Sequence, residues 1–271
     1  MRISGWAAAA ALCVAVSAVG YASARPDMAQ GAFLPGLDFG KPYLAPSSED
    51  PLTLSPPAPA EGSTRLARDL EANRAAMKGQ GGARWNLAAR DADLRAGAVG
   101  RSFSCTAGIA ISETATPAIA RLLKRANSDF AASTSTVKDH YQRNRPFMDN
   151  GQPTCTPADE AGLRRNWSYP SGHSAIGYGA GLVLAALFPE KATALVARGR
   201  AFGDSRYLCN VHWLSDVEEG RVYATAAFAR LVANVEFQRD LQAARAEVQA
   251  MKGKLPAPEG CAEEAAALAS R

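Results

Sequence analysis

The sequence predicts a mainly α-helical protein, and two observations carry that prediction. Signals for β-strands are scarce, and alanine, the strongest helix former, is abundant. Hydrophobic residues make up 47% and charged residues 21% of the 271 positions, which is ordinary for one globular domain with its own core. The net charge of +4 includes no lysine- or arginine-rich tract, so we expect no nucleic-acid partner.

The first 24 residues have the pattern of an export signal. Arg2 gives a positive start, an apolar run follows over about residues 6–19, and residues 22–24 (Ala-Ser-Ala) suit a signal peptidase. A membrane anchor is the weaker alternative, because the apolar run is short for a bilayer span. We therefore expect cleavage after Ala24 and a soluble periplasmic or secreted protein that has no membrane contact.

The cysteines suit an oxidising compartment. Cys13 leaves with the signal, so four of the five cysteines remain: Cys105, Cys155, Cys209 and Cys261. An even number favours disulfides, with buried free thiols as the alternative, and no pair has the spacing of a zinc site. Four cysteines allow three pairings, of which we favour Cys155–Cys209, because both lie near motifs described below. We expect no metal and no other cofactor.

The rest of the chain divides into a proline-rich arm, residues 25–60, and a helical domain, residues 61–271. Proline forbids a long helix and suggests an arm extended over the surface, to which Phe39, Leu52 and Leu54 would contribute apolar contacts. A disordered linker is the alternative. The helices expected in the domain span about residues 63–77, 116–141, 171–188, 212–235 and 237–251.

Two of these expected helices have informative faces. Ser63 is suited to cap the first, whose apolar side would comprise Leu66, Leu70 and Met77. The helix at 171–188 contains glycines at 177, 179 and 181, which are costly in a helix interior. We expect a neighbouring helix backbone to approach closely there.

Three short clusters carry residues suited to phosphate chemistry. In the first, Lys138 precedes Arg145 by seven residues, about two helical turns, so both cations would face one side of a helix that ends before Pro146. Alone, such a pair is more often a solvated surface.

The second cluster is Pro170-Ser171-Gly172-His173, at the predicted start of the helix at 171–188. The free N–H groups at a helix start bind anions, Ser171 can cap the helix or offer its hydroxyl, and Gly172 lets a ligand approach the backbone. His173 adds a titratable group beside that site. Without it, a serine–glycine helix start is often only structural.

In the third cluster, Ser205 and Arg206 are followed by His212 and Asp216. Residues four apart share a helix face, so Asp216 could bond one imidazole nitrogen of His212 and leave the other free to attack. A surface His–Asp pair without a catalytic role is the alternative for this cluster alone.

Together the clusters resemble the signature of the type 2 phosphatidic acid phosphatase superfamily, which includes the vanadium haloperoxidases. Residues 60–63, 138–141 and 168–169 further resemble the bacterial class A non-specific acid phosphatases. One departure is Trp167, a bulky residue where a small one is expected, which puts substrate preference in doubt. Every fixed position of the signature is present: Lys138, Arg145, Pro146, Pro170, Ser171, Gly172, His173, Ser205, Arg206, His212 and Asp216.

The resemblance implies a compact all-α bundle with its pocket among helix ends, and an acid phosphatase that needs no metal. His212 would be the nucleophile, supported by Asp216, and His173 would be the general acid and base. The phosphate would be held by Lys138, Arg145, Ser171, Gly172 and Arg206. Nearby cations would keep His212 neutral, while bound phosphate would favour protonated His173, which predicts an acidic pH optimum.

The substrates expected are small phosphate monoesters such as nucleotides, sugar phosphates and aryl phosphates, with possible transfer of phosphate to alcohols. Inorganic phosphate or vanadate would inhibit, and a homodimer is the expected assembly. Three alternatives remain: a vanadate-dependent haloperoxidase, a lipid phosphatase, and a phosphate-binding protein or adhesin without catalysis. The third histidine, His140, lies off the helical face of Lys138 and is interpreted as structural.

Overall fold

The structure is a computed structural model that describes residues 1, 37, 39–47, 49–251 and 257–270. Within them every regular element is helical, which confirms the all-α prediction. The predicted signal peptide lies outside the described residues apart from Met1, as does the arm before residue 37. No helix in the described part of the chain combines the length and apolar character that a membrane crossing requires.

The described elements comprise twelve α-helices and three 3-10 helices. The α-helices are α1 (Thr64–Met77), α2 (Ala83–Asp91), α3 (Ala98–Ala107), α4 (Pro117–Ala132), α5 (Ser135–Tyr141), α6 (Pro146–Asn150), α7 (Glu160–Leu163), α8 (Gly172–Leu187), α9 (Ala192–Leu208), α10 (Leu214–Val232), α11 (Val235–Ala250) and α12 (Cys261–Ala269). The 3-10 helices are η1 (Pro51–Thr53), η2 (Pro157–Asp159) and η3 (Pro189–Lys191).

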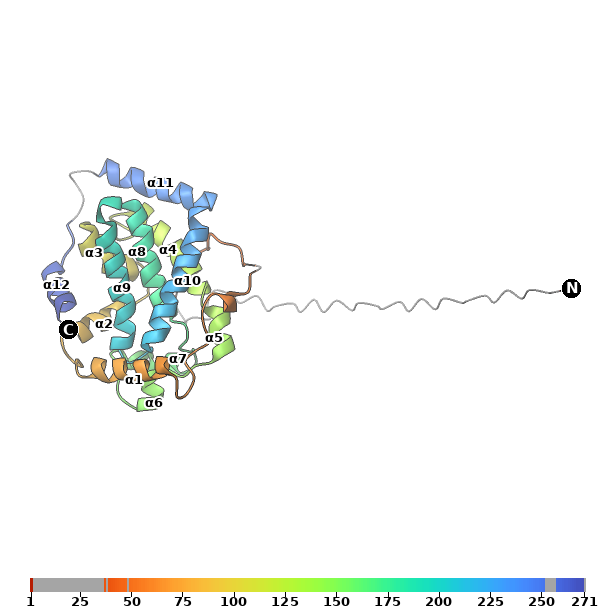
Figure 1. Cartoon of the computed structure of the whole chain (residues 1–271). Coiled ribbons are helices and arrows are strands. Elements are labelled where there is room, and N and C mark those ends of the chain that lie inside the picture. Colours follow the sequence, from red (N-terminus) through yellow and green to blue (C-terminus); the bar gives the residue numbers. More distant parts are fainter. Residues whose placement is uncertain (2–36, 38, 48, 252–256, 271) are drawn as a thin grey trace.

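Helix α8 is the centre of the bundle, where α4, α9 and α10 pack around it. Figure 1 shows α11 crossing one end of this bundle and α1 crossing the other. The expected close approach occurs at Gly181, where a Cβ atom would lie 2.8 Å from the Leu195 carbonyl oxygen of α9. At Gly177 and Gly179 the space is filled by aromatic rings of neighbouring helices instead. The glycines thus allow the neighbouring helices to pack closely against α8.

Helix α1 begins as predicted but buries a different face. The Ser63 hydroxyl accepts a hydrogen bond from the Leu66 amide, as an N-cap should. The apolar-face prediction is wrong, because Leu70 is 40% exposed whereas Asp69 and Asn73 are buried. The inward side of α1 is polar because it lies over buried polar groups near the start of α10.

The single helix predicted over residues 116–141 is two helices, α4 and α5. Ser133 and Thr134 interrupt it, and their hydroxyls donate to the carbonyls of Phe130 and Ala131 at 2.7 and 3.2 Å. Such local side-chain bonds compete with the helical pattern and explain the break. Helix α5 can therefore take a direction of its own and carries Lys138 into the interior.

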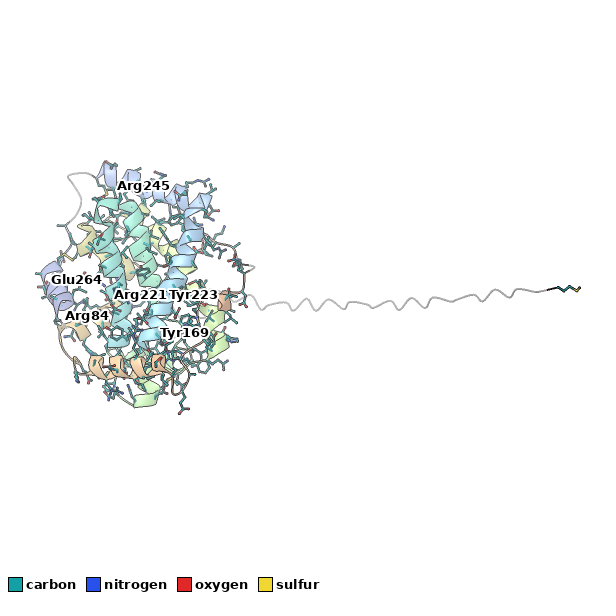
Figure 2. The ribbon with its side chains drawn as sticks, in the orientation of Figure 1. Arg84, Tyr169, Arg221, Tyr223, Arg245 and Glu264 are labelled. Atoms are coloured by element: carbon teal, nitrogen blue, oxygen red, sulfur yellow. A yellow bond between two sulfur atoms is a disulfide. The ribbon has the colours of Figure 1, made fainter. Side chains whose placement is uncertain are left out.

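The described part of the arm packs along the domain surface. Tyr43 is buried, and its hydroxyl donates to Asp240 of α11 at 2.7 Å. The hydroxyls of Tyr223 and Tyr169 donate to the carbonyls of Pro51 and Pro56 at 2.7 and 2.6 Å, and both tyrosines lie on this side of the bundle in Figure 2. Leu54, expected to be buried, is 41% exposed. Tyrosine hydroxyls of the domain therefore supply hydrogen bonds to arm carbonyls that have no helical partner.

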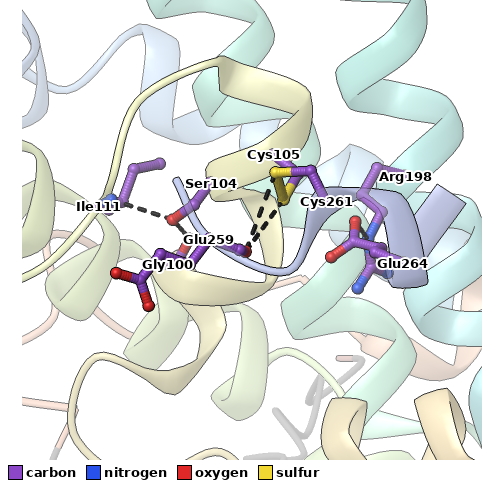
Figure 3. The surroundings of a disulfide bond; sticks show 8 residues. All are labelled: Gly100, Ser104, Cys105, Ile111, Arg198, Glu259, Cys261 and Glu264. Atoms are coloured by element: carbon purple, nitrogen blue, oxygen red, sulfur yellow. Dashed lines mark hydrogen bonds and ion pairs between the residues drawn. A yellow bond between two sulfur atoms is a disulfide. The ribbon is translucent and has the colours of Figure 1, made fainter. Parts of the chain in front are cut away.

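Two disulfides fasten peripheral segments. Cys155 is joined to Cys209, the pairing favoured from the sequence, and this bond ties the loop before η2 to the end of α9. Cys105 of α3 is joined to Cys261 of α12, as Figure 3 shows. The second pair connects positions 156 residues apart and fixes the C-terminal helix to the bundle.

Candidate active site

The three sequence clusters meet at one end of α8. The Ser171 amide donates to the Asp216 carbonyl at 2.9 Å, which joins the second cluster to the third. Arg145 Nη1 lies 2.9 Å from His212 Nε2, which joins the first to the third. All the predicted site residues are buried, and the side chains other than Gly172 are 4% exposed or less: Lys138, Arg145, Ser171, Gly172, His173, Arg206, His212 and Asp216.

Lys138 and Arg145 reach this place from different elements, so the prediction of one shared helix face is wrong. Helix α5 ends at Gln142, whose φ of 47° is left-handed. Arg145 then adopts an extended conformation (φ −86°, ψ 151°) before Pro146, as expected, and begins α6. The turn between the two short helices, rather than helical periodicity, brings the cations together.

Backbone carbonyls orient the Arg145 guanidinium. Nε donates to the Asn166 carbonyl at 2.8 Å and Nη1 to the Val211 carbonyl at 2.8 Å. Burial, followed by repulsion from Arg206, lowers the pKa of Arg145 to about 9. Lys138 Nζ similarly donates to the carbonyl of Trp167, so Trp167 contributes its backbone to both cations. These hydrogen bonds hold the two cations near each other despite their repulsion.

His212 lies just before α10, not inside the predicted helix. The helix starts at Leu214 with Trp213 as N-cap, and Asp216 accepts the Trp213 amide at 2.8 Å. This capping geometry places the Asp216 carboxylate 3.4 Å from His212 Nδ1. The predicted His–Asp contact therefore exists, but a helix start creates it in place of a shared helix face.

The protonation of His212 follows from its partners. A guanidinium only donates, so Nε2 accepts from Arg145 and carries a lone pair. Nδ1 carries the proton and faces Asp216 and the Ser168 hydroxyl, the latter at 3.2 Å. Burial, then Arg145, Lys138 and Arg206, lowers the pKa of His212 well below its usual value. The imidazole is neutral and presents Nε2 to the cations.

A buried polar network supports the Asp216 carboxylate. Its Oδ2 accepts from Ser168, and its Oδ1 accepts from Arg143 Nη1 at 2.7 Å. Arg143 also donates to Asp69 of α1 at 2.7 Å, and Asp69 accepts the Ser215 amide at 2.8 Å. Each carboxylate oxygen of Asp216 thus has a fixed donor, which holds the group in one orientation toward His212.

The start of α8 supplies the second histidine. The Ser171 hydroxyl accepts the Ser174 amide at 3.2 Å and caps the helix, so Gly172 and His173 lie in its first turn. His173 Nε2 donates to the Ala92 carbonyl at 3.0 Å. Burial and Arg206 lower the pKa of His173 well below its usual value. Protonation of His173, expected for a general acid, therefore requires a nearby anion.

Arg206 is a buried cation with two donor atoms that have no hydrogen-bond partner among the described residues. Its side chain is 1% exposed, yet Nε and Nη1 have no hydrogen-bond partner among the described residues. Burial lowers its pKa to about 10, so it keeps its charge. Buried donors without partners are costly, and an anion would satisfy them. The fork of a guanidinium matches the oxygens of a phosphate.

The arrangement combines three buried cations, the first turn of a long helix and a neutral imidazole whose Nε2 lone pair faces Arg145. Such a site can bind a tetrahedral oxyanion and offer it a nucleophile. Across the described residues, no group of three or more His, Cys, Asp and Glu side chains is placed to hold a metal ion.

Comparison with known proteins agrees with this chemistry. The model of the PAP2 superfamily matches residues 119–240. An acid phosphatase of Zymomonas mobilis is 37% identical over 210 residues, which cover 78% of this chain and 80% of that protein. The chain belongs to the acid phosphatases of the PAP2 superfamily.

Two further relatives of this PAP2 phosphatase are named non-specific acid phosphatases. The protein of Providencia stuartii is 40% identical over 204 residues, covering 75% of this chain and 82% of the relative. That of Salmonella typhimurium is 39% identical over 194 residues, covering 71% and 78%. The resemblance to non-specific acid phosphatases noted from the sequence is thereby confirmed.

Some site residues of the phosphatase were not predicted. Arg143 lies between two motif positions, and its charge was a weak signal that could have been noticed. Ser168 was noted only as flanking sequence, and Asp69 reaches the site from α1, which no local pattern indicates. His140 remains outside, exposed and in edge contact with the Tyr141 ring at 4.6 Å between centroids.

Proposed function

We propose that this chain hydrolyses small phosphate monoesters through a phosphohistidine formed on His212. The observation that carries the proposal is the Nε2 atom of His212, which bears a lone pair and lies 2.9 Å from the Arg145 guanidinium. A phosphoryl group attacked by that atom would be surrounded by the charges of Arg145, Lys138 and Arg206. Electrostatic stabilisation and positioning are what phosphoryl transfer requires from a protein.

In the first step, an oxygen of the bound phosphate group takes over the hydrogen bond from Arg145 Nη1, and the Nε2 lone pair that this releases attacks phosphorus in line with the ester oxygen. The Nε2–P bond forms, the P–O ester bond breaks, and the departing oxygen takes a proton from His173. The phosphorylated ring of His212 keeps its Nδ1 proton and becomes cationic. Asp216, near Nδ1, stabilises this charge, while the equatorial oxygens are bound by Lys138, Arg145, Arg206, the Ser171 hydroxyl and the Gly172 amide.

In the second step, neutral His173 removes a proton from water as the water oxygen attacks phosphorus. The P–Nε2 bond breaks, phosphate departs, and both histidines return to their starting states. An alcohol in place of water would yield a new phosphate ester, so phosphate transfer to added alcohols or nucleosides is part of the proposal. The three cations supply the charge that metal ions supply in other phosphatases, so no metal is required.

The substrates proposed are nucleotides, sugar phosphates and aryl phosphates, with inorganic phosphate and vanadate as inhibitors. Two disulfides support a location in the periplasm or outside the cell. Cell fractionation with detection of the processed N-terminus tests that location. The homodimer expected from the family resemblance is also part of the proposal, and sedimentation tests it.

Hydrolysis of p-nitrophenyl phosphate at mildly acid pH, with chelator present, tests the chemistry. Wild-type protein, His212→Ala and the control His140→Ala, which changes an exposed histidine outside the site, are compared. We expect chelator-resistant activity that His212→Ala abolishes and His140→Ala retains. Activity that survives in His212→Ala would mean a different nucleophile. An inactive wild type would contradict the proposed function.

A further inference from the structure

The C-terminal helix α12 lies outside the three motifs but is connected to them through buried charges. The Cys105–Cys261 disulfide fixes its first residue to α3. One turn later, Glu264 accepts a hydrogen bond from Arg198 of α9 at 2.9 Å. Figure 3 shows Glu264 directed at Arg198 beside the disulfide. The C-terminal segment therefore reaches the bundle interior by a side chain as well as by a covalent bond.

Arg198 also contacts Asp91, the last residue of α2. Its guanidinium is 2% exposed and binds both carboxylate oxygens of Asp91, at 2.6 and 3.2 Å. Asp91 is fully buried. Buried ion pairs add little net stability, because removing both charges from water costs about as much as their attraction returns. A role in placing other groups is a better explanation of this pair.

Asp91 contacts the catalytic region at two points. Its Oδ2 accepts from the Ser205 hydroxyl at 2.6 Å, and Ser205 immediately precedes Arg206. The residue after Asp91 is Ala92, whose carbonyl accepts from His173 Nε2 at 3.0 Å. The Asp91 carboxylate thus binds the residue that precedes Arg206, and the backbone after Asp91 carries the carbonyl that accepts from His173.

Arg206 needs such support because it has few hydrogen bonds of its own. With Nε and Nη1 unpaired, its guanidinium is aimed by α9 and by the packing around it. The Asp91 charge also raises the pKa of Arg206, after Asp159, against the larger lowering effect of burial. A ligand-binding group is effective when neighbouring residues fix it before the ligand arrives.

We propose that Asp91 is a positioning residue for the phosphatase reaction, acting on Arg206 and on His173. Helix α12 holds Asp91 in place through Arg198. This inference rests on the proposed function for its catalytic meaning, although its effect on phosphate binding is measurable separately.

The test compares Asp91→Asn with wild-type protein. We expect the inhibition constant of inorganic phosphate to rise roughly tenfold, the size of one charge-assisted hydrogen bond. The alkaline limb of the pH–rate profile should also shift, because the Ala92 carbonyl that accepts from His173 directly follows Asp91 and should move when the contacts of Asp91 weaken. In an Arg206→Lys background the same change should weaken phosphate binding much less, since a residue that acts through Arg206 has little left to position.

Milder variants keep the test valid if Asp91→Asn fails to fold. Glu264→Gln removes the charge that binds Arg198, the partner of Asp91. We expect phosphate inhibition to weaken about twofold to threefold. Its matched control is Glu263→Gln, which alters an exposed acid on the same helix and should change nothing. Cys105→Ser combined with Cys261→Ser should act in the same direction as Glu264→Gln.

Three results would overturn the inference. The first is a folded Asp91→Asn protein with unchanged phosphate inhibition and an unchanged pH profile. The second is full additivity of Asp91→Asn with Arg206→Lys, which would indicate a purely structural role. The third is an equal effect of Glu263→Gln and Glu264→Gln. If the wild-type protein has no activity, the proposed function fails, and calorimetric binding of inorganic phosphate to the same variants still decides the role of Asp91.

Discussion

Arg143 Nη1 lies 2.7 Å from Oδ1 of Asp216, the carboxylate that faces the proposed nucleophile. The same guanidinium binds Asp69 at 2.7 Å, so one arginine joins two buried carboxylates from α1 and α10. Arg143 thus binds the carboxylate oxygen of Asp216 that does not face His212. We therefore expect the orientation of the proposed nucleophile, His212, to depend on Arg143.

Replacing Arg143 by Gln should lower kcat about 10- to 100-fold, the effect expected for losing hydrogen bonds between charged groups. Without the guanidinium, Asp216 can turn away from Nδ1, and the cationic phosphohistidine loses stabilisation. KM should change less, because Arg143 binds Asp216 and Asp69 and is not one of the groups proposed to bind phosphate. Steady-state kinetics with p-nitrophenyl phosphate measures both constants.

The control for this prediction is Arg165→Gln, which removes an exposed arginine in the turn after α7. It should leave kcat unchanged. A folded Arg143→Gln protein with the kcat of the wild type would show that Asp216 keeps its orientation without Arg143.

Features that depend on residues close together in the sequence, such as helix starts, were predicted well. The N-cap at Ser63 and the start of α8 at Ser171 follow from local hydrogen bonding, and both are present. The close approach at Gly181 was predicted because glycine in a helix interior needs a reason. Long-range features were predicted poorly. Asp69 lies on the buried side of α1 because it binds Arg143, a partner 74 residues away that no periodicity reveals.

The predicted site residues lie together in the structure, but two of the local structures expected around them differ. Helical spacing correctly indicated contact between His212 and Asp216, although the contact arises at a helix start. Helical spacing also suggested one helix for Lys138 and Arg145. Gln142, whose φ is in the left-handed region, instead ends α5 and changes the direction of the chain. Spacing restricts which residues can meet, but breaks and caps depend on tertiary packing.

The activity should have an acidic pH optimum, and each limb of the pH–rate profile can be assigned to one histidine. His212 must be neutral to attack, and its lowered pKa places the rising limb well below pH 6.5. His173 must be protonated, and its pKa is lowered by burial and Arg206, so kcat/KM should fall as pH rises through a value below 6.5. A bound phosphate anion raises the pKa of His173, so the falling limb of kcat should lie at higher pH than that of kcat/KM.

Profiles of kcat and kcat/KM measured on the same protein check this order of limbs. Two aryl phosphates whose phosphate groups differ in pKa separate substrate ionisation from that of His173. Coincident falling limbs for kcat and kcat/KM with both substrates would contradict the assignment, as would a rate that rises steadily into alkali.

Replacing His173 by Asn should affect the two chemical steps differently. Loss of a general acid and base costs about 100- to 10,000-fold, but p-nitrophenolate leaves readily without a proton. With p-nitrophenyl phosphate the phosphohistidine should then accumulate, because water still lacks a base. Rapid mixing should show a burst of p-nitrophenol followed by slow turnover, and an alkyl phosphate should show no burst. An equal loss of rate with both substrates and no burst would contradict this role.

Replacing Arg206 by Lys tests whether its unpaired donors bind phosphate. The variant keeps a positive charge but loses the forked donors, which lysine cannot reproduce. Since Nε and Nη1 make no other hydrogen bond among the described residues, the folded protein loses little, whereas the inhibition constant of phosphate should rise about 10- to 100-fold. Thermal unfolding and phosphate inhibition are measured together, with Arg200→Lys as control, an exposed position on the same helix. Lower thermal stability with unchanged phosphate inhibition would mean that Arg206 supports the fold and that other groups bind the anion.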